Sequence, residues 1–592
     1  MVYSDLRKYF PTKPDIQVFK EYAEEMSQIP TPKINTDIPV EDDTITDFKH
    51  TNLEVLDDDF LDKTDKQTVL IDSRTKDDKY SIDDINLDHV ENQLKEANKQ
   101  LIKKYKKIFA KDPYDVGDTD LLEANIDVSE IPKRQQQRVI PPDKIKMTQG
   151  IIDKFLENGV ISVCPNPLYT SNLVLVAKYK SSNRYTTNAD GLHKIDDEII
   201  SYRLCQDFRA LNAATKVKFN TAYSNPLRDL SKFAGKVMTS LDICQAYFSV
   251  RLDDYTKRLT AFYFDKKIYC WNKLSQGLQN APMLFIYFLT LVFSDESLSD
   301  ALKELTTSEM ELLKRSHTKI SWSEFLESYF DDIWIFSEDH ELHYVHLKLT
   351  FHALYKAKLK INPKKVKMYT YECSILGQKF NSKNIELFMD GVKLSHILSW
   401  GRPNSCFELH SRLCSLFYLV RFLPLLKHFA LPLIEILRSK NFKWGKVENI
   451  AWSNIMLLVK LDIHLTVPTP EQKLVLFSDA SKFACSQILF VEKDGYLKLV
   501  ACNSAVFGKQ DVRKAPYIKE CISLIKGLKT FEPYIAASTQ KTVVFCDALS
   551  IVYVNRSKTF EINSFNLVNH LLYFQTNYRF QLLHLPGNFL LC

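Results

Sequence analysis

The order of apolar and polar positions divides the chain into stretches of different predicted structure. A helical pattern begins near residue 91, another lies within 144–161, and the apolar run Leu173–Val176 predicts a strand. Between residues 200 and 385, short strand-like runs mix with amphipathic helical runs, which is an α+β pattern. Residues 386–467 are mainly helical. The chain is therefore expected to fold as an α+β protein.

Two further features set the expected domain boundaries. Val467-Pro468-Thr469-Pro470 is typical of a linker, and strands and helices resume after it. Residues 1–90 contain no glycine and are polar and acidic, so we expect a mostly disordered arm there. The predicted segments are the arm (1–90), a linker or entry segment (91–140), an α+β region (141–385), a helical connection (386–467) and a final strand–helix domain (468–592).

Charge is distributed unevenly along the 592 residues. The formal net charge is +5, yet residues 37–88 hold 17 acidic and six basic side chains, a local charge of −11 that leaves +16 for the rest. A basic body with a separate acidic arm suggests contact with a polyanion such as nucleic acid. An ordinary solvated surface gives the same balance, so charge alone leaves both interpretations open.

Cysteines and apolar runs indicate the compartment. The 12 cysteines are scattered, without a C-x-x-C pair, which favours buried thiols in a reducing environment over zinc ribbons. The longest apolar runs, Ala281–Phe293 and Leu413–Leu426, are shorter than the ~18–20 residues that span a bilayer. We expect an intracellular protein without a membrane span, in a cytoplasmic particle or the nucleus.

Two adjacent carboxylates interrupt a strongly strand-like run. In SYFDDIWIFS, residues 328–337, Asp331 and Asp332 lie between aromatic and β-branched residues. A tight hairpin would place both aspartates at its tip, where a divalent cation would cancel their repulsion. A plain Asp-Asp turn explains the same residues, because aspartate is a common turn residue.

A third carboxylate favours the metal-binding interpretation. Asp242 ends the strand-like segment Thr239–Asp242 and is followed by a compact turn with the aromatic pair Tyr247-Phe248. Carboxylates from two strand ends would together hold two Mg²⁺ (or Mn²⁺) ions. Such a pair of ions activates an attacking hydroxyl and neutralises a leaving oxygen, as phosphodiester formation requires.

Six blocks in order give the chain a specific resemblance. They are YFDD (329–332), LDICQAYFSVRL, YRLCQDFRALNAAT, WNKLSQGLQNAPMLF, YKAKLKINPKKVKM and ILGQKF. From about residue 100 to the end, the chain resembles the reverse transcriptase–ribonuclease H region of retroviral and LTR-retrotransposon polyproteins, especially the gypsy class. The resemblance implies a right-hand polymerase with fingers and palm in 141–385 and thumb and connection in 386–467, followed by an α/β ribonuclease H-like domain.

The resemblance also implies residue roles. Asp242 and Asp331 would hold the metals, with Asp332 supporting the site. Tyr247 would lie under the sugar of the incoming nucleotide, although a core tyrosine is an alternative. Gln276 and Gly277 would line the nucleotide pocket, and Lys178 and Arg203 would clamp the triphosphate. Taken alone, either cation is more often a solvated surface group. Leu376-Gly377 would help to grip the primer.

A second set of acids lies downstream. Asp479 and Asp547 each end a strand-like run, and Glu520 lies between them on a helix, off its apolar stripe. A simply exposed glutamate is the alternative for Glu520. Two strand-end aspartates and a helical glutamate are what a ribonuclease H site requires for metal-activated water. The segments SDAS, YIKEC and CDAL resemble the corresponding family segments, so we predict metal binding and catalysis by all three acids.

The chain departs from the family pattern in three places. The segment between Lys178 and Arg203 is longer, and a polar stretch (294–324) separates Phe285 from Tyr329; both are expected to be surface insertions. After Pro586-Gly587-Asn588 the family's fourth ribonuclease H aspartate does not appear, so we expect weak or absent ribonuclease activity from a C-terminally truncated domain. No protease signature or integrase zinc segment occurs, which indicates either a segment of a larger product or a decayed copy.

The function predicted from the sequence is RNA-directed, and also DNA-directed, DNA synthesis. Its expected partners are an RNA template, a DNA primer or RNA–DNA hybrid, and deoxynucleoside triphosphates. A non-catalytic nucleic-acid-binding derivative of a retroelement is the alternative, and a structural subunit that pairs with a complete chain is a third hypothesis. The retained Asp242, Asp331 and Asp332 favour the enzyme.

Overall fold

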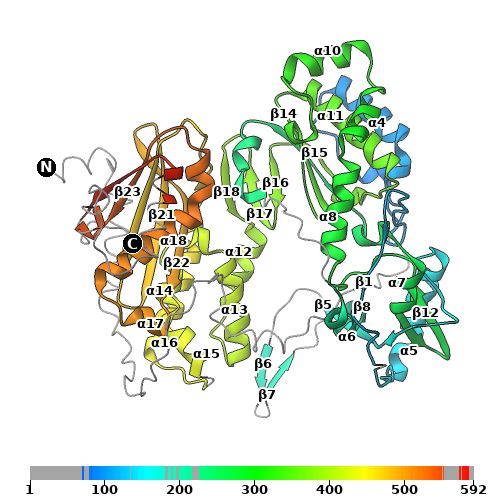
Figure 1. The fold of residues 1–592 in the computed structure, drawn as a ribbon, viewed down its shortest axis with the longest axis horizontal. Coiled ribbons are helices and arrows are strands. Elements are labelled where there is room, and N and C mark those ends of the chain that lie inside the picture. The colour runs from blue at the N-terminus through cyan, green and yellow to red at the C-terminus, as the bar shows by residue number, and fades with distance from the viewer. Residues whose placement is uncertain are drawn as a thin grey trace. The chain divides into compact units, whose positions relative to one another are not determined.

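The computed structural model describes residues 70–72, 79–133, 135–179, 185–188, 191–194, 199–216, 226–439, 441–549, 551–552, 573–574 and 576–585 (Figure 1). The chain divides into two compact units. The first contains residues 56–226 and 236–373, and the second contains 227–235 and the residues from 374 onward. The predicted acidic arm lies mostly outside the described residues. Within its range, Ile85, Leu87 and Val90 are buried, so ordered structure begins before residue 91.

The central sheet of the first unit is antiparallel and contains the paired aspartates. Its order is β13 (Leu326–Tyr329), β14 (Asp332–Ser337), β9 (Val237–Asp242) and β15 (Lys367–Thr370). Ile333 to Phe336 are all buried in β14. A strand buried on both faces reads as a continuous apolar run, which explains the sequence on the C-terminal side of the two aspartates.

Smaller sheets complete the first unit. One has the order β3 (Ile161–Val163), β12 (Lys267–Trp271), β11 (Ala261–Phe264) and β4 (Thr170–Ser171). Another has the order β1 (Leu70–Asp72), β8 (Ile199–Gln206) and β5 (Leu173–Tyr179). Two pairs remain, β2 (Glu123–Ala124) with β10 (Arg251–Leu252), and β6 (Tyr185–Asn188) with β7 (Gly191–Lys194). The predicted insertion after Lys178 thus contains an antiparallel strand pair.

Helices enclose the core of the first unit. They are α4 (Asn92–Lys104), α5 (Pro142–Glu157), α6 (Arg209–Ala214), α7 (Asp254–Leu259), α8 (Ala281–Val292), α9 (Asp295–Leu302), α10 (Thr307–Ser316) and α11 (His340–Lys356). In the described chain, residues 281–302 form one stretch long and apolar enough to cross a membrane by length and composition. That finding corrects the expectation that no run is long enough, but Phe285 and Phe288 of this stretch are fully buried in the core, as in the core helix of a globular domain.

The stretch 294–324 is not a surface insertion, which corrects the sequence-based expectation. It forms α9, α10 and a short 3₁₀ helix, and its apolar residues Leu298, Ala301, Leu313 and Trp322 are buried in the main core. Ion pairs link it to its neighbours: Lys348 of α11 with Glu309, and Lys104 of α4 with Glu304. In Figure 1, α4, α10 and α11 lie together at one end of this unit. The segment is therefore part of the folded core.

A chain of polar side chains runs through this core beneath the central sheet. The Thr239 hydroxyl lies 2.7 Å from His343 Nε2, and His343 Nδ1 lies 2.8 Å from the Ser337 hydroxyl. Ser337 also contacts His346 Nδ1 at 2.7 Å, and His346 Nε2 lies 3.0 Å from His317 Nε2. Burial lowers the pKa of His343 to about 3 and holds the pKa of His346 well below 6.5. Both imidazoles are therefore neutral at neutral pH.

The second unit begins with a small sheet and a group of helices. The sheet has the order β16 (Glu372–Ile375), β17 (Gln378–Asn381), β18 (Glu386–Met389) and β19 (Leu465–Thr466). The helices are α12 (Gly391–Leu398), α13 (Cys406–Tyr418), α14 (Leu426–Phe429), α15 (Leu431–Ser439) and α16 (Lys446–Lys460). The turn at Leu376-Gly377 joins β16 to β17, and Lys393 Nζ donates to the Gly377 carbonyl at 2.9 Å.

A five-stranded mixed sheet forms the rest of this unit. Its order is β22 (Tyr496–Val506), β21 (Ala484–Lys493), β20 (Leu474–Ala480), β23 (Thr542–Cys546) and β24 (Phe580–His584). Strands β20, β23 and β24 are parallel, whereas β20, β21 and β22 are antiparallel. The 22-residue helix α18 (Pro516–Ala537) packs on this sheet, where Gly527 lies so close to Gln487 that a Cβ would meet its Cγ at 2.9 Å. The short helix α17 (Lys509–Val512) precedes α18.

Candidate active sites

The strand register brings the first three aspartates together. Asp332, the first residue of β14, is paired with Asp242, the last residue of β9. The Ile243 N–H donates to the Asp331 carbonyl at 2.8 Å, which fixes the turn residue against the end of β9. Carboxylates that are 90 residues apart in the sequence therefore share one sheet edge.

The predicted hairpin is confirmed, but its turn is shifted by one residue. Tyr329 pairs with Asp332, so the two-residue turn is Phe330-Asp331 and Asp332 already belongs to the strand. Phe330 has φ of +51°, a left-handed conformation that costs a non-glycine residue roughly 1–2 kcal/mol. The Phe330 ring lies edge-on to Tyr329 at 4.7 Å between centroids. This strained turn leaves Asp331 exposed and Asp332 half-buried.

The local electrostatics suit a divalent cation. Burial, followed by the Asp331 and Asp242 charges, raises the pKa of Asp332 to about 7. Burial also raises the pKa of Asp242, and the Lys365 ammonium opposes that rise from 2.7 Å. Mutually repelling carboxylates at one edge are a donor set that hard divalent cations favour. Asp242, Asp331 and Asp332 therefore supply the donor chemistry of the metal site that the sequence predicts, and metal binding by them stays a prediction.

Lys365 was not identified from the sequence as a site residue. The Asn362 N–H donates to the Asp242 carbonyl at 2.9 Å, and the 3₁₀ turn Pro363–Lys365 that follows brings the ammonium to the acid. The only sequence signal was its place in the lysine-rich block INPKKVKM. A block rich in cations gives no indication of which lysine meets the acid, because that depends on a tertiary backbone contact.

Tyr247 and the residues 276–277 lie in the same unit as these acids. Tyr247 is half-buried, its ring lies 5.3 Å from that of Phe285 on α8, and burial raises its pKa to about 12. Gln276 is half-buried, and Gly277 is exposed with φ of +89°, which favours glycine there. The structure places these residues, and their nucleotide-binding roles stay predictions.

Lys178 and Arg203 belong to neighbouring strands. Lys178 of β5 is paired with Ser201 of β8, and Arg203 of β8 is paired with Val176 of β5. Their side chains lie outside the described structure, so a triphosphate clamp at these residues also stays a prediction.

The second set of acids meets at the carboxyl ends of two parallel strands in the five-stranded sheet. Ser478 and Cys546 are in register on the parallel strands β20 and β23, so the residues that follow them, Asp479 and Asp547, lie at the same edge. Glu520 of α18 accepts a hydrogen bond from the Ala480 N–H at 3.0 Å. The structure thus brings together the three acids that the sequence singled out.

Glu520 is buried, so the exposed-glutamate alternative is wrong. Its side chain is 8% exposed, and Oε2 is buried without a hydrogen-bond partner in the described structure. Burial, followed by the Asp479 charge, raises the pKa of Glu520 to about 8, and burial raises that of Asp479 to about 6. A buried carboxylate oxygen without a hydrogen-bond partner is a donor that suits a divalent cation. Among the residues described, no group of three or more His, Cys, Asp or Glu side chains is placed so that it could hold a metal ion without rearrangement.

One histidine at this edge was also not identified from the sequence. His584 of β24 is paired with Cys546, and its Nε2 lies 3.7 Å from Asp547 Oδ1. Parallel pairing of β23 with β24 brings them together, and that pairing is not visible in the sequence. The expected weak or absent ribonuclease activity rests on residues 586–592, which lie outside the described residues, so it stays a prediction.

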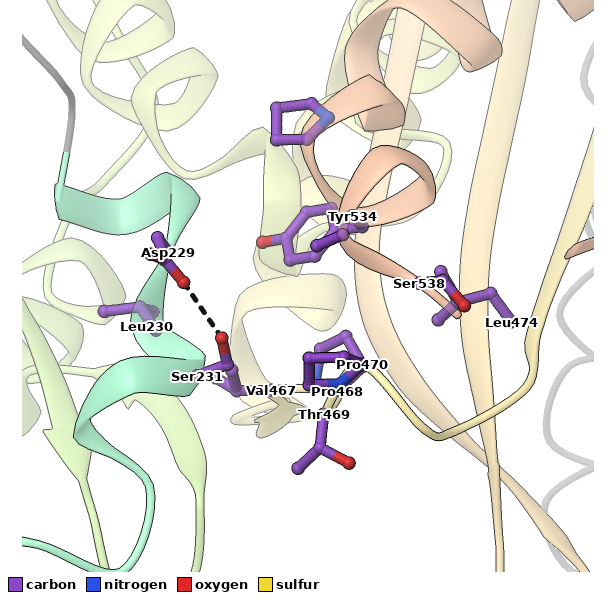
Figure 2. A pocket seen from close by; sticks show the side chains of 12 residues that line it. Asp229, Leu230, Ser231, Val467, Pro468, Thr469, Pro470, Leu474, Tyr534 and Ser538 are labelled. Atoms are coloured by element: carbon purple, nitrogen blue, oxygen red, sulfur yellow. Dashed lines mark hydrogen bonds between the residues drawn. The ribbon is translucent and has the colours of Figure 1, made fainter. Parts of the chain in front are cut away.

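A pocket in the second unit is too small to hold a substrate. It lies between residues 229–231, the linker 467–470 and the end of α18, and Ser231 donates to Asp229 at its wall (Figure 2). Its cavity volume of about 20 Å³ has room for about one water molecule. The linker predicted at Val467-Pro468-Thr469-Pro470 thus forms one wall of this small pocket.

Two family models match the chain over the segments that contain these sites. The model for reverse transcriptase (RNA-dependent DNA polymerase) matches residues 192–380, and the model for the RNase H-like domain found in reverse transcriptase matches residues 469–576. The chain therefore contains a reverse transcriptase domain followed by the RNase H-like domain found in reverse transcriptases. Both carboxylate sites of this reverse transcriptase chain lie within the matched segments.

Relatives and solved structures agree with that assignment. The Tf2-3 and Tf2-7 transposon polyproteins of Schizosaccharomyces pombe are each 23% identical over 428 residues, covering 70% of this chain. The chain spans 28% of the length of these curated relatives. A foamy viral protease–reverse transcriptase in complex with RNA/DNA hybrid has a TM-score of 0.64 at 20% identity, covering 86% of this chain and 62% of that one. A second foamy viral structure, the dRH form with ds DNA, has a TM-score of 0.65 at 20% identity, covering 86% of this chain and 81% of that one. The fold predicted from the sequence, a right-hand polymerase followed by a ribonuclease H-like domain, is confirmed.

Proposed function

We propose that this chain catalyses RNA-directed, and also DNA-directed, addition of deoxynucleotides to a primer 3′-hydroxyl. The observation that carries the proposal is the register of β14 on β9, which places Asp332 opposite Asp242 with Asp331 in the adjoining turn. Separate positions in the sequence are thereby combined into one carboxylate site at an exposed sheet edge. Such a site is what phosphoryl transfer with two metal ions requires.

Each acid has a proposed role in this site. Asp242 and Asp331 would hold Mg²⁺ or Mn²⁺, and Asp332 would support them. When bound, the ions supply charge that activates the 3′-hydroxyl and neutralises the leaving pyrophosphate oxygen. The rigid strand ends of β9 and β14 keep the carboxylates in position, so little reorganisation is needed during the reaction.

The remaining site residues would handle the nucleotide. Tyr247, held against Phe285, would contact the sugar and exclude a 2′-hydroxyl. Gln276 and Gly277 would line the nucleotide pocket, and Lys178 and Arg203 would clamp the triphosphate of a deoxynucleoside triphosphate. These assignments rest on the matched motifs and on the place of each residue in the fold.

We also propose RNA template, DNA primer and RNA–DNA hybrid as partners. The foamy viral neighbours were solved with RNA/DNA hybrid and with double-stranded DNA, which supports a nucleic-acid duplex as the ligand of this fold. The net positive charge of the chain outside the acidic arm favours contacts with the phosphate backbone of such a duplex. We propose an intracellular location, in a cytoplasmic particle or the nucleus, and the 11 described cysteines, all free thiols, support it.

Primer extension on an RNA template tests the polymerase proposal. We expect the purified chain to extend a DNA primer with Mg²⁺ or Mn²⁺ and to stop when the metal is chelated. Binding of the template–primer without any extension, with an affinity that falls as salt rises, would support the non-catalytic binding protein instead.

We also propose that the ribonuclease H-like domain cleaves the RNA strand of an RNA–DNA hybrid. Asp479, Glu520 and Asp547 would hold the metal that activates water. We expect the purified chain to release labelled fragments from the RNA strand of a hybrid when Mg²⁺ or Mn²⁺ is present. No release under these conditions would contradict the proposal.

Lys365 is expected to compete with metal for Asp242. Its ammonium lies 2.7 Å from Asp242 Oδ1, so a cation must displace it or share the carboxylate. Lys365→Met should therefore reduce the Mg²⁺ concentration for half-maximal extension by roughly two- to fivefold. Lys364→Met is the matched control, because Lys364 lies over the Tyr80 ring instead of on the acid. Equal Mg²⁺ requirements for the two variants would contradict competition at Asp242.

A further inference from the structure

The turn that leads into α8 is built around Gly277. The Gly277 backbone has φ of +89°, which side-chain-bearing residues rarely adopt. The turn contains the proposed nucleotide-contacting residues Gln276 and Gly277, and α8 begins just after it at Ala281. Leu278 of this turn is buried in the main core, whereas Gly277 is exposed. Core packing therefore holds the Leu278 side chain, and the Gly277 carbonyl is held by another group.

Asn212 holds this turn from two sides. The Asn212 side-chain amide donates to the Gly277 carbonyl at 2.8 Å, and the Asn212 side-chain oxygen accepts from the Gln279 N–H at 2.9 Å. A single side chain thus bonds both limbs of the turn. Asn280, the next residue, donates to the Lys216 carbonyl at 3.1 Å, which ties the start of α8 to the same neighbouring segment.

The platform that carries Asn212 is itself fixed. Asn212 belongs to α6, whose Leu211 and Ala214 are buried. The Ala214 carbonyl accepts from the Ser129 N–H at 2.8 Å, and Thr215 forms a β-bridge with Val128. A short helix with buried residues and a strand-like partner at its end has little freedom to move. The Asn212 side chain therefore holds the Gly277 carbonyl and the Gln279 N–H in place relative to this fixed helix.

The turn also influences Tyr247. Helix α8 continues from the turn to Phe285, whose ring lies 5.3 Å from the Tyr247 ring. A displaced turn would therefore shift the start of the helix that supports this tyrosine. The two sides of the proposed nucleotide pocket thus share one support.

We propose that Asn212 is a positioning residue for nucleotide binding: it sets the Gln276–Gln279 turn for the incoming deoxynucleoside triphosphate. The inference rests on the proposed polymerase function and adds a residue to it. Asn212 acts through the turn and is not itself assigned contact with the nucleotide. Its loss should weaken nucleotide binding without changing the metal site or the binding of the duplex.

Asn212→Asp provides a direct test in the full chain. Aspartate keeps the acceptor for the Gln279 N–H but replaces the donor to the Gly277 carbonyl with a repelling oxygen. We expect the KM for the deoxynucleotide to rise on the order of tenfold, the value expected for one lost hydrogen bond next to a charge. The kcat and the Kd for template–primer should stay within about twofold of the unmodified chain.

Asn272→Asp is the matched control. Asn272 in the same unit also donates to a backbone carbonyl, that of Gly159 at 3.1 Å, and its side-chain oxygen accepts from the Ser162 hydroxyl at 2.9 Å. This variant makes the same chemical change away from the turn, so its KM for the deoxynucleotide should not change. A merely structural effect would shift both variants alike.

The outcomes separate this inference from the function on which it rests. An equal KM change in both variants, or a change only in kcat or duplex Kd for Asn212→Asp, would overturn the role of Asn212 while leaving the polymerase intact. If Asn212→Asp loses its cooperative thermal transition, Asn212→Ser takes its place, and an unchanged KM there would overturn the role too. No extension by the unmodified chain would refute the proposed function itself, and this inference with it.

Discussion

Asp331→Asn should abolish primer extension while leaving the fold unchanged. Asparagine has nearly the shape of aspartate and suits the turn, but it cannot supply the negative charge that a divalent cation needs. Asp331 is exposed in the Phe330-Asp331 turn, so its loss leaves no cavity and no buried unpaired group. We expect the extension rate to fall on the order of 1,000-fold or more, because the charge that stabilises the transition state is lost.

Asp339→Asn is the matched control for this experiment. Asp339 lies eight residues further on and accepts from the Leu342 N–H at 2.8 Å as the N-cap of α11. Asparagine is an equally good N-cap, so extension and melting temperature should both stay near those of the unmodified chain. Extension by Asp331→Asn at more than about a tenth of the control rate would contradict a metal-binding role for Asp331.

Glu520→Gln should make the metal-free protein more stable at neutral pH, although it removes a proposed catalytic group. Burial raises the pKa of Glu520 from about 4.5 in the unfolded chain to about 8, so folding at pH 7 forces the carboxyl to take up a proton. That proton uptake costs about 3 kcal/mol at pH 7, which glutamine avoids. We therefore expect the variant to unfold at higher denaturant concentration, yet to lose hydrolysis of the RNA–DNA hybrid.

The pH dependence provides the internal control. Below pH 4.5 the carboxyl is protonated in both states, so the stability difference between Glu520→Gln and the unmodified chain should vanish. The difference should grow as the pH rises from 4.5 to 8, because Glu520 must take up a proton when the unmodified chain folds. The free-energy cost of that proton uptake increases with pH over this range. Added Mg²⁺ should narrow the gap by binding only the carboxylate. A constant gap at all pH values would show that titration of Glu520 is not its cause.

Local patterns in the sequence were sufficient for the hairpin and for the strand-end acids. The run from Ile333 to Phe336 is apolar because β14 is central and buried, and that pattern survives in any tertiary context. The pairing of Asp332 with Asp242 is different, because register across 90 residues is set by the whole sheet. The resemblance of the sequence motifs to those of a known family predicted that these two acids share one site, and the hydrophobic periodicity alone did not.

Other features could not be predicted because they depend on tertiary contacts. Lys365 meets Asp242 through a backbone bond of Asn362, and no sequence pattern marks one lysine of that block over another. Glu520 lies off the apolar stripe of its helix and is nevertheless buried, where it accepts a hydrogen bond from the Ala480 N–H of β20. The stretch 294–324 is polar overall, and its few apolar residues were too sparse to predict that Leu313 and Trp322 join the core.

The buried polar chain beneath the central sheet restricts where protons can be. The Ser337 hydroxyl lies between His343 Nδ1 and His346 Nδ1 but has one proton to give, so at least one of these neutral rings must carry its proton on Nδ1. The tautomers of these two α11 rings are thus linked through one hydroxyl on β14. Nitrogen NMR of the two imidazoles would record this dependence, and Ser337→Ala should release both rings from it. Strands β9 and β14, which carry Asp242 and Asp332, are therefore held to α11 by hydrogen bonds whose directions depend on these tautomers, as well as by packed side chains.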